Sequence, residues 1–546
     1  MKQYYFWFGL ILISAITSCT PEFKAELDER LEEARNTYYI SPSGSDTNGG
    51  NSPDDAWKTI DKINNFDFLP GSKILFEGGK TFNGTVSLDK DDANDGVNPV
   101  LISSYGGGKA TIYAGNSFGF NIYNTAGIKI ENLIIEGSGM NINRESGIQF
   151  YNDLPNDIKL DYIRIKNIEV KGFRNYGIVI GAYNGNSGFN DILIENTKVF
   201  DILDKGIASY GKFDYLKTGY AHSNLIVRNA EVYNIRGYNK GSHSGNGIEL
   251  SDVQYSTIEY STVYNCGQGN ATCGGPVGIW YWDADQVTIQ YNEAYNISSG
   301  SGCDGGGFDF DGGVTNGIMQ YNYSHDNDGG GFLIGQFTWA RKMDNIIVRY
   351  NISENDAGTN GGSVYLFNGE KMASMNNIYV YNNTFYINKR KSNPDPAAIK
   401  FNKWKTIGGN INFYNNILYA NEGADFLNVP SGYSANFKGN LYHSKAAATM
   451  KYHGVAYNTL EEFRATGKEI HNDLPIGIQQ DPMLQGAGTG KVIGFGNDLK
   501  SLHGYKIESG SPAKDRGISV SGNGDSDYFG NLPVKGNSQD IGAHEL

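Results

Sequence analysis

The chain reads Gly307-Phe308-Asp309-Phe310-Asp311 near its centre, and earlier segments repeat the pattern as Gly247-Ile248-Glu249-Leu250-Ser251 and Gly278-Ile279-Trp280-Tyr281-Trp282. Later segments at 331–335, 363–367 and 398–402 follow it as well. Each segment begins with a small residue and has apolar residues at its second and fourth positions, while the third and fifth vary. This alternation is typical of a β-strand with one buried face. Because the segments recur every 24 to 35 residues, they predict a solenoid.

A series of asparagines provides a second repeat. Each member follows a short β-rich run, and the series comprises Asn132, Asn167, Asn196, Asn229, Asn292, Asn322, Asn351, Asn383, Asn416 and Asn440. Only Ser261 interrupts it, between Asn229 and Asn292. Asparagine tolerates the left-handed backbone of a tight corner, and its side-chain amide is able to bond to the asparagine one coil above. We therefore predict an asparagine ladder along one corner of the solenoid.

The coil length, the inward aliphatic stacks and the asparagine ladder together resemble the right-handed parallel β-helix of the pectin-lyase-like superfamily. The resemblance covers about residues 38–485 and implies an all-β domain of about 11–13 coils. The superfamily includes lyases, glycoside hydrolases, esterases and non-catalytic adhesins, so the resemblance is specific for the fold and leaves the reaction open. The segment 38–82 looks like the N-terminal part of many secreted β-helix enzymes that act on polysaccharides.

The composition narrows the class of partner. The 546 residues carry a formal net charge of −14, with a pI of about 5.1 and no basic run, so nucleic acid is not an expected partner. Aromatic residues make up 13% of the chain and include 37 tyrosines. Exposed tyrosine and tryptophan rings suit stacking on sugars, although many of these tyrosines are expected simply to flank corners. We expect a monomer that binds a polysaccharide.

The first residues have the character of a targeting segment. Met1-Lys2 precedes an apolar run from Tyr4 to Ile16 that is short for a membrane-spanning helix. The following Ile16-Thr17-Ser18-Cys19 resembles a bacterial lipobox, which implies cleavage before Cys19 and acylation of its sulfur. An ordinary secretory signal is the alternative. We expect a lipoprotein signal peptide at 1–19, a tether at 20–37, and a protein anchored by its lipid to a membrane of the cell envelope.

Both ends of a solenoid need a cap, because an open coil exposes its core and its strand edges. The segment 56–64 is predicted to form a short amphipathic helix over the first coil. Residues 486–546 resemble the closing segment of bacterial surface β-helix proteins and are predicted to cap the last coil. Insertions at 207–224, 266–276 and 389–396 are expected to form loops on one face, which in solenoids is often the binding face.

The cysteines leave two interpretations open. Besides Cys19 they are Cys266, Cys273 and Cys303, an odd number that excludes a full disulfide framework. Cys266 and Cys273 bracket one loop, and they either pair in an oxidising compartment or pack as thiols near corners.

The third and fifth strand positions face away from the core, and three successive coils carry unusual residues there. They are Glu249, then Trp280 and Trp282, then Asp309 and Asp311. Residues i and i+2 of a strand lie about 6.6 Å apart and coils stack about 4.8 Å apart, which puts Glu249 roughly 10 Å from Asp309. Inverting glycosidases hold their carboxyl groups about 6.5–9.5 Å apart, which suits Asp309 and Asp311. Glu249 is then a third carboxylate or the acid, and crowding keeps one carboxyl group protonated.

Other residues are candidates for binding. Trp280 and Trp282 would form the floor of sugar subsites. His243 leads into these strands, with a structural corner hydrogen bond as the alternative, while Tyr365 and Lys400 occupy outward positions in later coils. Asp304 is a candidate ligand for calcium. Hydrolysis by carboxylates requires no cofactor, so Ca²⁺ is expected only if the acidic cluster is a metal site.

The sequence therefore predicts an extracytoplasmic enzyme that cleaves a polysaccharide by glycoside hydrolysis, with Glu249, Asp309 and Asp311 as catalytic residues. One alternative is a calcium-dependent pectate or uronate lyase, which needs a lysine or arginine base. Lys400 lies three coils from Asp309, roughly 14 Å away, and Arg341 falls in a loop, so neither is placed beside the acidic strand. The second alternative is a non-catalytic glycan-binding β-helix, which would use the aromatic residues but not the aspartates.

Overall fold

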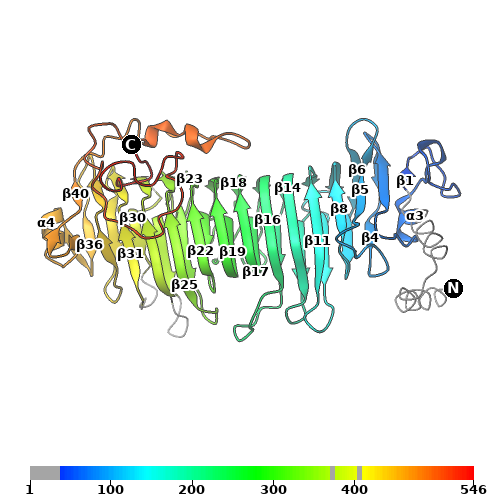
Figure 1. The fold of residues 1–546 in the computed structure, drawn as a ribbon, viewed down its shortest axis with the longest axis horizontal. Coiled ribbons are helices and arrows are strands. Elements are labelled where there is room, and N and C mark those ends of the chain that lie inside the picture. Colours follow the sequence, from blue (N-terminus) through cyan, green and yellow to red (C-terminus); the bar gives the residue numbers. More distant parts are fainter. Residues whose placement is uncertain (1–36, 369–374, 391, 403–408) are drawn as a thin grey trace, which may run out of the picture.

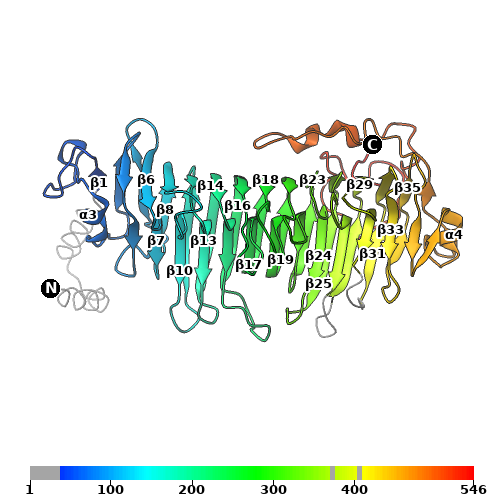
Figure 2. The same ribbon diagram turned by 180° about the vertical axis from the view of Figure 1, so that it is seen from behind.

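The computed structural model describes residues 37–368, 375–390, 392–402 and 409–546. In these residues the strands stack in parallel as an elongated right-handed β-helix with the first and last coils at opposite ends (Figure 1). Seen from behind, loops project from one long edge of the stack (Figure 2). None of the helices within the described ranges is long and apolar enough to cross a membrane. The predicted fold class is confirmed.

Each coil contributes strands to three parallel columns. The first column, which carries the candidate site, contains β7 (Phe120–Tyr123), β10 (Ile148–Asn152), β13 (Tyr176–Ala182), β15 (Lys205–Tyr210), the first halves of β17 (Asn246–Glu259) and β19 (Val277–Gln290), β21 (Gly306–Phe310), β24 (Phe332–Gln336), β27 (Gly362–Asn368), β30 (Ala397–Phe401) and β33 (Asp425–Val429). The second contains β8 (Ile128–Glu131), β11 (Lys159–Lys166), β14 (Gly188–Ile202), β16 (His222–Ile235), the second halves of β17 and β19, β22 (Thr315–Gln320), β25 (Met343–Arg349), β28 (Met375–Tyr381) and β31 (Ile411–Tyr414). The third contains β9 (Leu133–Gly137), β12 (Glu169–Lys171), the ends of β14 and β16, β18 (Thr262–Cys266), β20 (Glu293–Ile297), β23 (Tyr323–His325), β26 (Ile352–Glu354), β29 (Thr384–Asn388), β32 (Ile417–Asn421) and β35 (Leu441–His443).

The second and fourth positions of the strand pattern point into the β-helix, as predicted. Their side chains are fully buried in one continuous core, and in the three central coils they are Ile248, Leu250, Ile279, Tyr281, Phe308 and Phe310. Burying an aliphatic or aromatic side chain of this size contributes about 1.5–3 kcal/mol. Trp280, between Ile279 and Tyr281, is also buried but does not belong to this core, because it points to the outer side.

The asparagine ladder is confirmed, but it has two parts with different geometry. Asn132, Asn167, Asn196 and Asn229 adopt the predicted left-handed backbone, with φ between 50° and 58°. From the coil of Ser261 onward, the preceding residue takes that conformation, and the asparagine itself turns inward. These inner asparagines are fully buried, and each donates its amide to the next side chain at 3.0 or 3.1 Å: Asn292, Asn322, Asn351, Asn383 and Asn416.

Ser261 and Glu469 mark the two ends of the inner ladder. Ser261, which interrupts the sequence series, donates its backbone N–H to the amide oxygen of Asn292 at 2.9 Å. At the other end, the buried carboxyl group of Glu469 accepts from the Asn440 amide at 2.7 Å and from the Tyr442 hydroxyl at 2.8 Å. Burial raises the pKa of Glu469 to about 7. The serine is therefore a member of the ladder and not a break in it.

The N-terminal cap is confirmed as helix α3 (Ile60–Asn64), which is shorter than the predicted segment 56–64. The Thr59 side chain accepts a hydrogen bond from the Lys62 N–H, so the helix begins only after Thr59. Trp57 instead forms a parallel bridge with Ile40. Ile60 and Ile63 are the buried residues of the helix, and both join the core of the first coils.

The prediction that residues 486–546 cap the last coil is wrong. Helix α4 (Leu460–Arg464) and β40 (Ile478–Gln479), which pairs with β35, lie at that end of the stack. Residues 486–546, the flank segment, run back along the third column (Figure 1). They share a second hydrophobic core with it, in which Ile352 from the coils meets Tyr505 and Ile541 from the segment. The third column needs this cover because it carries apolar side chains on its outer side.

Candidate active site

The candidate site lies where β17, β19 and β21 run side by side in the first column. Parallel pairing puts Glu249 opposite Trp280 and Trp280 opposite Asp309, so these side chains form one row across three coils. Trp282 follows two residues after Trp280, and Asp311 directly follows the end of β21. The fold therefore gathers all the predicted catalytic residues on the outer side of one column.

These carboxyl groups face outward but are not exposed. Glu249 is 2% exposed, Asp309 3% and Asp311 9%. The strand pattern alone predicts a solvated face at outward positions. Loops from neighbouring coils cover this face instead. One group of loops lies beyond one end of the strands, and a second group lies beyond the other end.

The first group of loops forms an aromatic wall over Trp282. The insertion between β15 and β16 places Phe213 5.6 Å from Trp282, between ring centroids, and the loop after β24 places Phe337 6.3 Å from it. Tyr215 and Trp339 extend the contact between the two loops, with their ring centroids 5.4 Å apart. The insertion predicted at 207–224 thus lies on the face that carries the candidate site.

Arg341 holds the loops of this aromatic wall together. Its guanidinium group forms an ion pair with Asp283, donates to the Gly219 carbonyl at 2.9 Å, and lies 4.0 Å from the centre of the Tyr220 ring. A second ion pair joins Lys217 of the insertion to Asp252. Arg341, considered above as the base of a lyase, therefore joins loops and does not lie in the row of Glu249 and Asp309.

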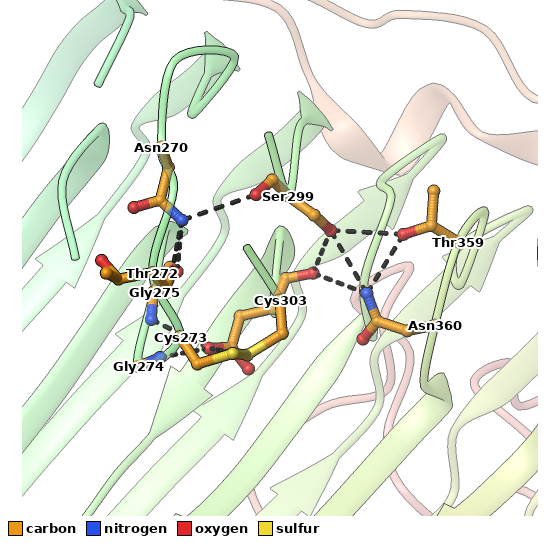
Figure 3. The surroundings of a disulfide bond; sticks show 10 residues. Asn270, Thr272, Cys273, Gly274, Gly275, Ser299, Cys303, Thr359 and Asn360 are labelled. Carbon is orange, nitrogen blue, oxygen red and sulfur yellow. Dashed lines mark hydrogen bonds between the residues drawn. A yellow bond between two sulfur atoms is a disulfide. The ribbon is translucent and has the colours of Figure 1, made fainter. Parts of the chain in front are cut away.

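The opposite loops are joined by a disulfide bond between Cys273 and Cys303 (Figure 3). The pairing of Cys266 with Cys273, one of the two interpretations, is wrong. Cys266 is a buried free thiol that aligns with Ile297 on the inner side of the third column. Cys273 and Cys303 instead lie in loops of adjacent coils, with their Cα atoms 4.8 Å apart.

Asp304, the candidate calcium ligand, is part of this loop group. Its carboxylate accepts the backbone N–H groups of Gly274 and Gly275, both at 2.8 Å. Burial raises the pKa of Asp304. In the part of the chain that the structure describes, no group of three or more His, Cys, Asp or Glu side chains is arranged to hold a metal ion. The neighbours of Asp304 therefore add no support to a calcium site, which stays a prediction.

Lys205 is the residue of the site that the sequence analysis missed. Its ammonium nitrogen lies 2.6 Å from Glu249 Oε1, and both side chains are largely buried. Burial raises the pKa of Glu249, but the charges of Lys205 and His243, together with the hydrogen bonds from Lys205 and Trp282, hold that pKa below its usual value. Lys205 directly precedes the glycine of the strand pattern in its coil, so a search of the third and fifth positions does not find it.

The two aspartates have pKa values shifted in the opposite direction. Burial raises the pKa of Asp309 well above its usual value, and the nearby charges of Asp311 and Asp304 raise it further. The pKa of Asp311 is raised by burial too, although the Gly312 N–H, which donates to Asp311 Oδ1 at 2.7 Å, lowers it. The surroundings of the site therefore shift the pKa values of Glu249 and Asp309 in opposite directions, a division that acid–base catalysis uses.

Three buried polar atoms of the row lack a hydrogen-bond partner among the described residues. They are Glu249 Oε2, Trp280 Nε1 and Asp309 Oδ1. A buried polar atom left without a partner costs about 1–3 kcal/mol, so such atoms are rare in folded proteins. Across the three coils these atoms are in turn an acceptor, a donor and a carboxyl oxygen. Such a row matches a ligand whose hydroxyl groups both donate and accept.

The remaining predicted residues lie at different distances from this row. The His243 ring lies 5.7 Å from the Trp280 ring, and its Nδ1 bonds to the Asn246 amide at 2.9 Å, as the structural alternative for this histidine expected. Trp280 is only 2% exposed, so it offers its indole N–H and not an open ring face. Tyr365 and Lys400 continue the row in register, two and three coils beyond Asp309. The Lys400 ammonium donates to the Asp395 carbonyl at 2.5 Å.

Comparisons with known proteins support the β-helix fold and find one short stretch of sequence similarity. No protein-family model matches the chain. A segment of 73 residues is 40% identical to a lacto-N-biosidase of Bifidobacterium longum subsp. longum and covers 13% of this chain but 5% of that protein's length. The crystal structure of a GH136 lacto-N-biosidase from Eubacterium ramulus superimposes with a TM-score of 0.50 at 20% identity, covering 78% of this chain and 71% of that one. A pectate lyase structure gives a TM-score of 0.39 at 15% identity, covering 93% and 96%.

Proposed function

We propose that this protein is a glycoside hydrolase that cleaves a terminal unit from a glycan at the row formed by Glu249, Trp280 and Asp309. The three unpaired polar atoms of that row carry the proposal, because strand pairing gathers them in one register on three successive coils. The likeness to lacto-N-biosidases, local in sequence and global in fold, supports the same class of reaction.

The pKa shifts suggest a role for each carboxyl group. Asp309, whose pKa is raised by burial, is the general acid that protonates the leaving oxygen. Asp311, two residues further along and about 6.6 Å away at strand spacing, is the carboxylate that activates water. Glu249 stays ionised beside Lys205 and stabilises the positive charge that develops on the sugar ring. The sequence interpretation of Glu249 as the acid is disfavoured, because its pKa is lowered.

The loops around the site support cleavage at a chain end. The aromatic wall of Phe213 and Phe337 stands over Trp282, and the disulfide-linked loops close the opposite side. A site walled on both sides suits the end of a glycan better than its middle. We propose a disaccharide unit such as lacto-N-biose as the group released, since both relatives are named lacto-N-biosidases.

We further propose that the enzyme acts outside the cytoplasm, held to a membrane through a lipid on Cys19. The support is the apolar run and the lipobox-like Ile16-Thr17-Ser18-Cys19, which lie outside the described residues. Labelling with a radioactive or clickable fatty acid in a bacterial host tests this, and Cys19→Ala is expected to abolish both the label and membrane recovery.

The proposed reaction is tested by incubating the protein with p-nitrophenyl lacto-N-bioside and with a panel of plant, algal and host glycans. Release of a sugar, lost by about 10²–10⁴-fold in Asp309→Asn, is the expected result. Asp344→Asn, a partly exposed strand carboxylate outside the site, is the matched control. NMR of the first product assigns its anomeric configuration, and inversion is expected from the spacing of Asp309 and Asp311. An unsaturated uronate product that disappears with a chelator would instead establish a calcium-dependent lyase, while binding without turnover would establish a lectin-like protein.

A further inference from the structure

A second cavity lies on another side of the same coils, between the flank segment and the corner where the second column passes into the third. Its volume is about 390 Å³, and its lining includes Tyr260, Tyr291, Glu293, Asn497, Lys500 and Tyr528. Tyr260 comes eleven residues after Glu249, at the far end of the long strand β17. The cavity is therefore separate from the row of catalytic carboxyl groups, and no step of the proposed hydrolysis uses it.

The cavity contains the first ring of a tyrosine stack. Tyr260 and Tyr291 stack with their centroids 5.0 Å apart and their planes 5° apart, and Tyr291 stacks on Tyr321 in the same way at 4.9 Å. The corner residue of the preceding coil is Asn229, which has no ring to continue the stack. Tyr260 is accordingly 50% exposed, and its face toward Asn229 is free of a stacked ring. An open aromatic face of this kind is the usual platform for the apolar face of a sugar ring.

Polar groups complete the cavity. The Tyr528 side chain is 1% exposed, and its hydroxyl has no hydrogen-bond partner within the described residues. The buried carboxylate of Glu293 holds the opposite wall in place, because it accepts the backbone N–H groups of Ile493 and Gly494, both at 2.7 Å. Lys500 and Asp498 are exposed on the rim and carry opposite charges. The cavity thus offers one aromatic face for stacking, a hydroxyl group without a partner among the described residues, and a rim on which one positive and one negative charge balance.

From this arrangement we infer that the cavity between Tyr260 and the flank segment is a non-catalytic binding site for a neutral saccharide. An anionic polymer is disfavoured by Asp498 and by the net charge of −14. The site would hold the enzyme on the glycan whose ends it trims, by adding a second contact to that of the active site. The saccharide class of the ligand rests on the proposed function, but the assay below does not depend on turnover.

The test uses the full chain with Asp309→Asn, so that bound glycan is not degraded. Affinity electrophoresis through gels that contain a neutral galactan, a xyloglucan, a mucin-type glycoprotein or polygalacturonate measures binding. Tyr260→Asn removes the ring but keeps a residue suited to the left-handed backbone at φ 52°, as Asn229 does in the coil before. Loss of one stacking contact is expected to weaken retention by a neutral glycan roughly tenfold. Tyr260→Phe keeps the ring face and is expected to retain binding.

Tyr255→Asn is the matched control, because Tyr255 is 49% exposed, has φ 56° and lies on β17 shortly before Tyr260, yet does not line the cavity. Equal retention of Tyr260→Asn and its parent would overturn the proposal, as would equal loss in Tyr255→Asn. Retention only by polygalacturonate, or by none of the four glycans, would overturn it as well. Circular dichroism and melting curves of each variant show that the fold is intact. Hydrolysis by the protein with Asp309 intact is scored separately, so failure of the proposed reaction is distinguishable from failure of this site.

Discussion

Lys205 makes the largest contribution to lowering the pKa of the buried Glu249. Its contact with Glu249 favours the charged form of that carboxylate despite burial, whereas Asp309 has no cation beside it among the described ion pairs and burial raises its pKa. The pKa values of two carboxyl groups roughly 10 Å apart at coil spacing are thus shifted in opposite directions by their surroundings, as in glycosidases. The position of a single lysine therefore matters as much as the carboxyl groups themselves.

Replacing Lys205 by methionine is expected to lower stability and activity together. Removal of one partner leaves Glu249 buried without a counter-charge, which costs about 3–5 kcal/mol. Chemical denaturation measures this cost. The double variant Lys205→Met with Glu249→Gln is expected to recover most of the stability but not the activity, and a double variant as unstable as Lys205→Met alone would contradict the ion-pair argument.

The pH profile of hydrolysis is expected to depend on the charge of Glu249. The proposed reaction requires Asp311 ionised, and burial together with the charges of Asp304 and Glu249 raises the pKa of Asp311. The acid limb of the kcat/KM profile should therefore lie above the ordinary aspartate value of about 3.9. Glu249→Gln removes one of the charges and is expected to move this limb to lower pH. An unchanged limb in this variant would show that another group titrates there.

The contribution of Asp309 to stability is expected to fall as pH rises above the ordinary aspartate pKa of about 3.9. Because the folded-state pKa of Asp309 is raised above its unfolded value, its stabilising contribution is fully present below the unfolded pKa and is lost as pH rises through the folded pKa. Asp309→Asn does not ionise, so its melting temperature should decline less between pH 5 and pH 8 than that of the parent. A parallel decline in both proteins would show that Asp309 is already ionised in the folded state.

At the scale of elements, the inner asparagine ladder is a continuous chain of buried amides. Asn351 accepts two hydrogen bonds from Asn322, through the backbone N–H at 2.9 Å and the side-chain amide at 3.0 Å. It also donates to Asn383 at 3.0 Å. Each asparagine thus forms hydrogen bonds with the coils on both sides of it, and these bonds fix the stacking of neighbouring corners. The exposed Asn167 makes a single such contact, to Asn132 at 2.6 Å.

Asn351→Ala is therefore expected to destabilise far more than Asn167→Ala. The first leaves two buried N–H groups without acceptors, at about 1–3 kcal/mol each. The second loses an exposed bond and places alanine in the left-handed region, at a cost of about 1–2 kcal/mol. Urea unfolding of the two variants compares them directly. Equal losses would indicate that the inner ladder contributes no more than the outer one.

At the scale of the whole molecule, the flank segment is bound to the coils as a separate layer. Its attachment rests on the second core and on buried carboxylates, since Glu354 accepts the Tyr505 hydroxyl at 2.6 Å and the Gly490 N–H at 3.0 Å. The coils beneath have their own core, which does not include Tyr505. Opening of the segment without unfolding of the β-helix is therefore permitted.

Tyr505→Ala is expected to loosen the flank segment and leave the coils folded. Truncation of a fully buried aromatic residue costs about 3–5 kcal/mol, and here the loss falls on one layer. Limited proteolysis followed by mass spectrometry should show faster cleavage within 486–546 and unchanged protection of 100–440. Simultaneous cleavage of both regions would mean that the two layers unfold as one unit.

The sequence by itself determined the β-helix, its coil period, the inward positions and the row of Glu249, Trp280 and Asp309. It did so because strand alternation and coil length are local properties that repeat, so each coil confirms the next. Parallel pairing then converts equal positions in successive segments into neighbours in space.

Only the tertiary structure decided the partners that come from outside the repeat. Lys205 reaches Glu249 from the adjacent coil, Cys273 pairs with Cys303 and not with Cys266, and residues 486–546 cover a flank and not an end. The loops that bury Asp309 and Asp311 likewise follow no sequence pattern that repeats from coil to coil. Such contacts depend on the path of irregular segments, which the strand pattern does not predict. They determine the burial and the charges that give the site its chemistry.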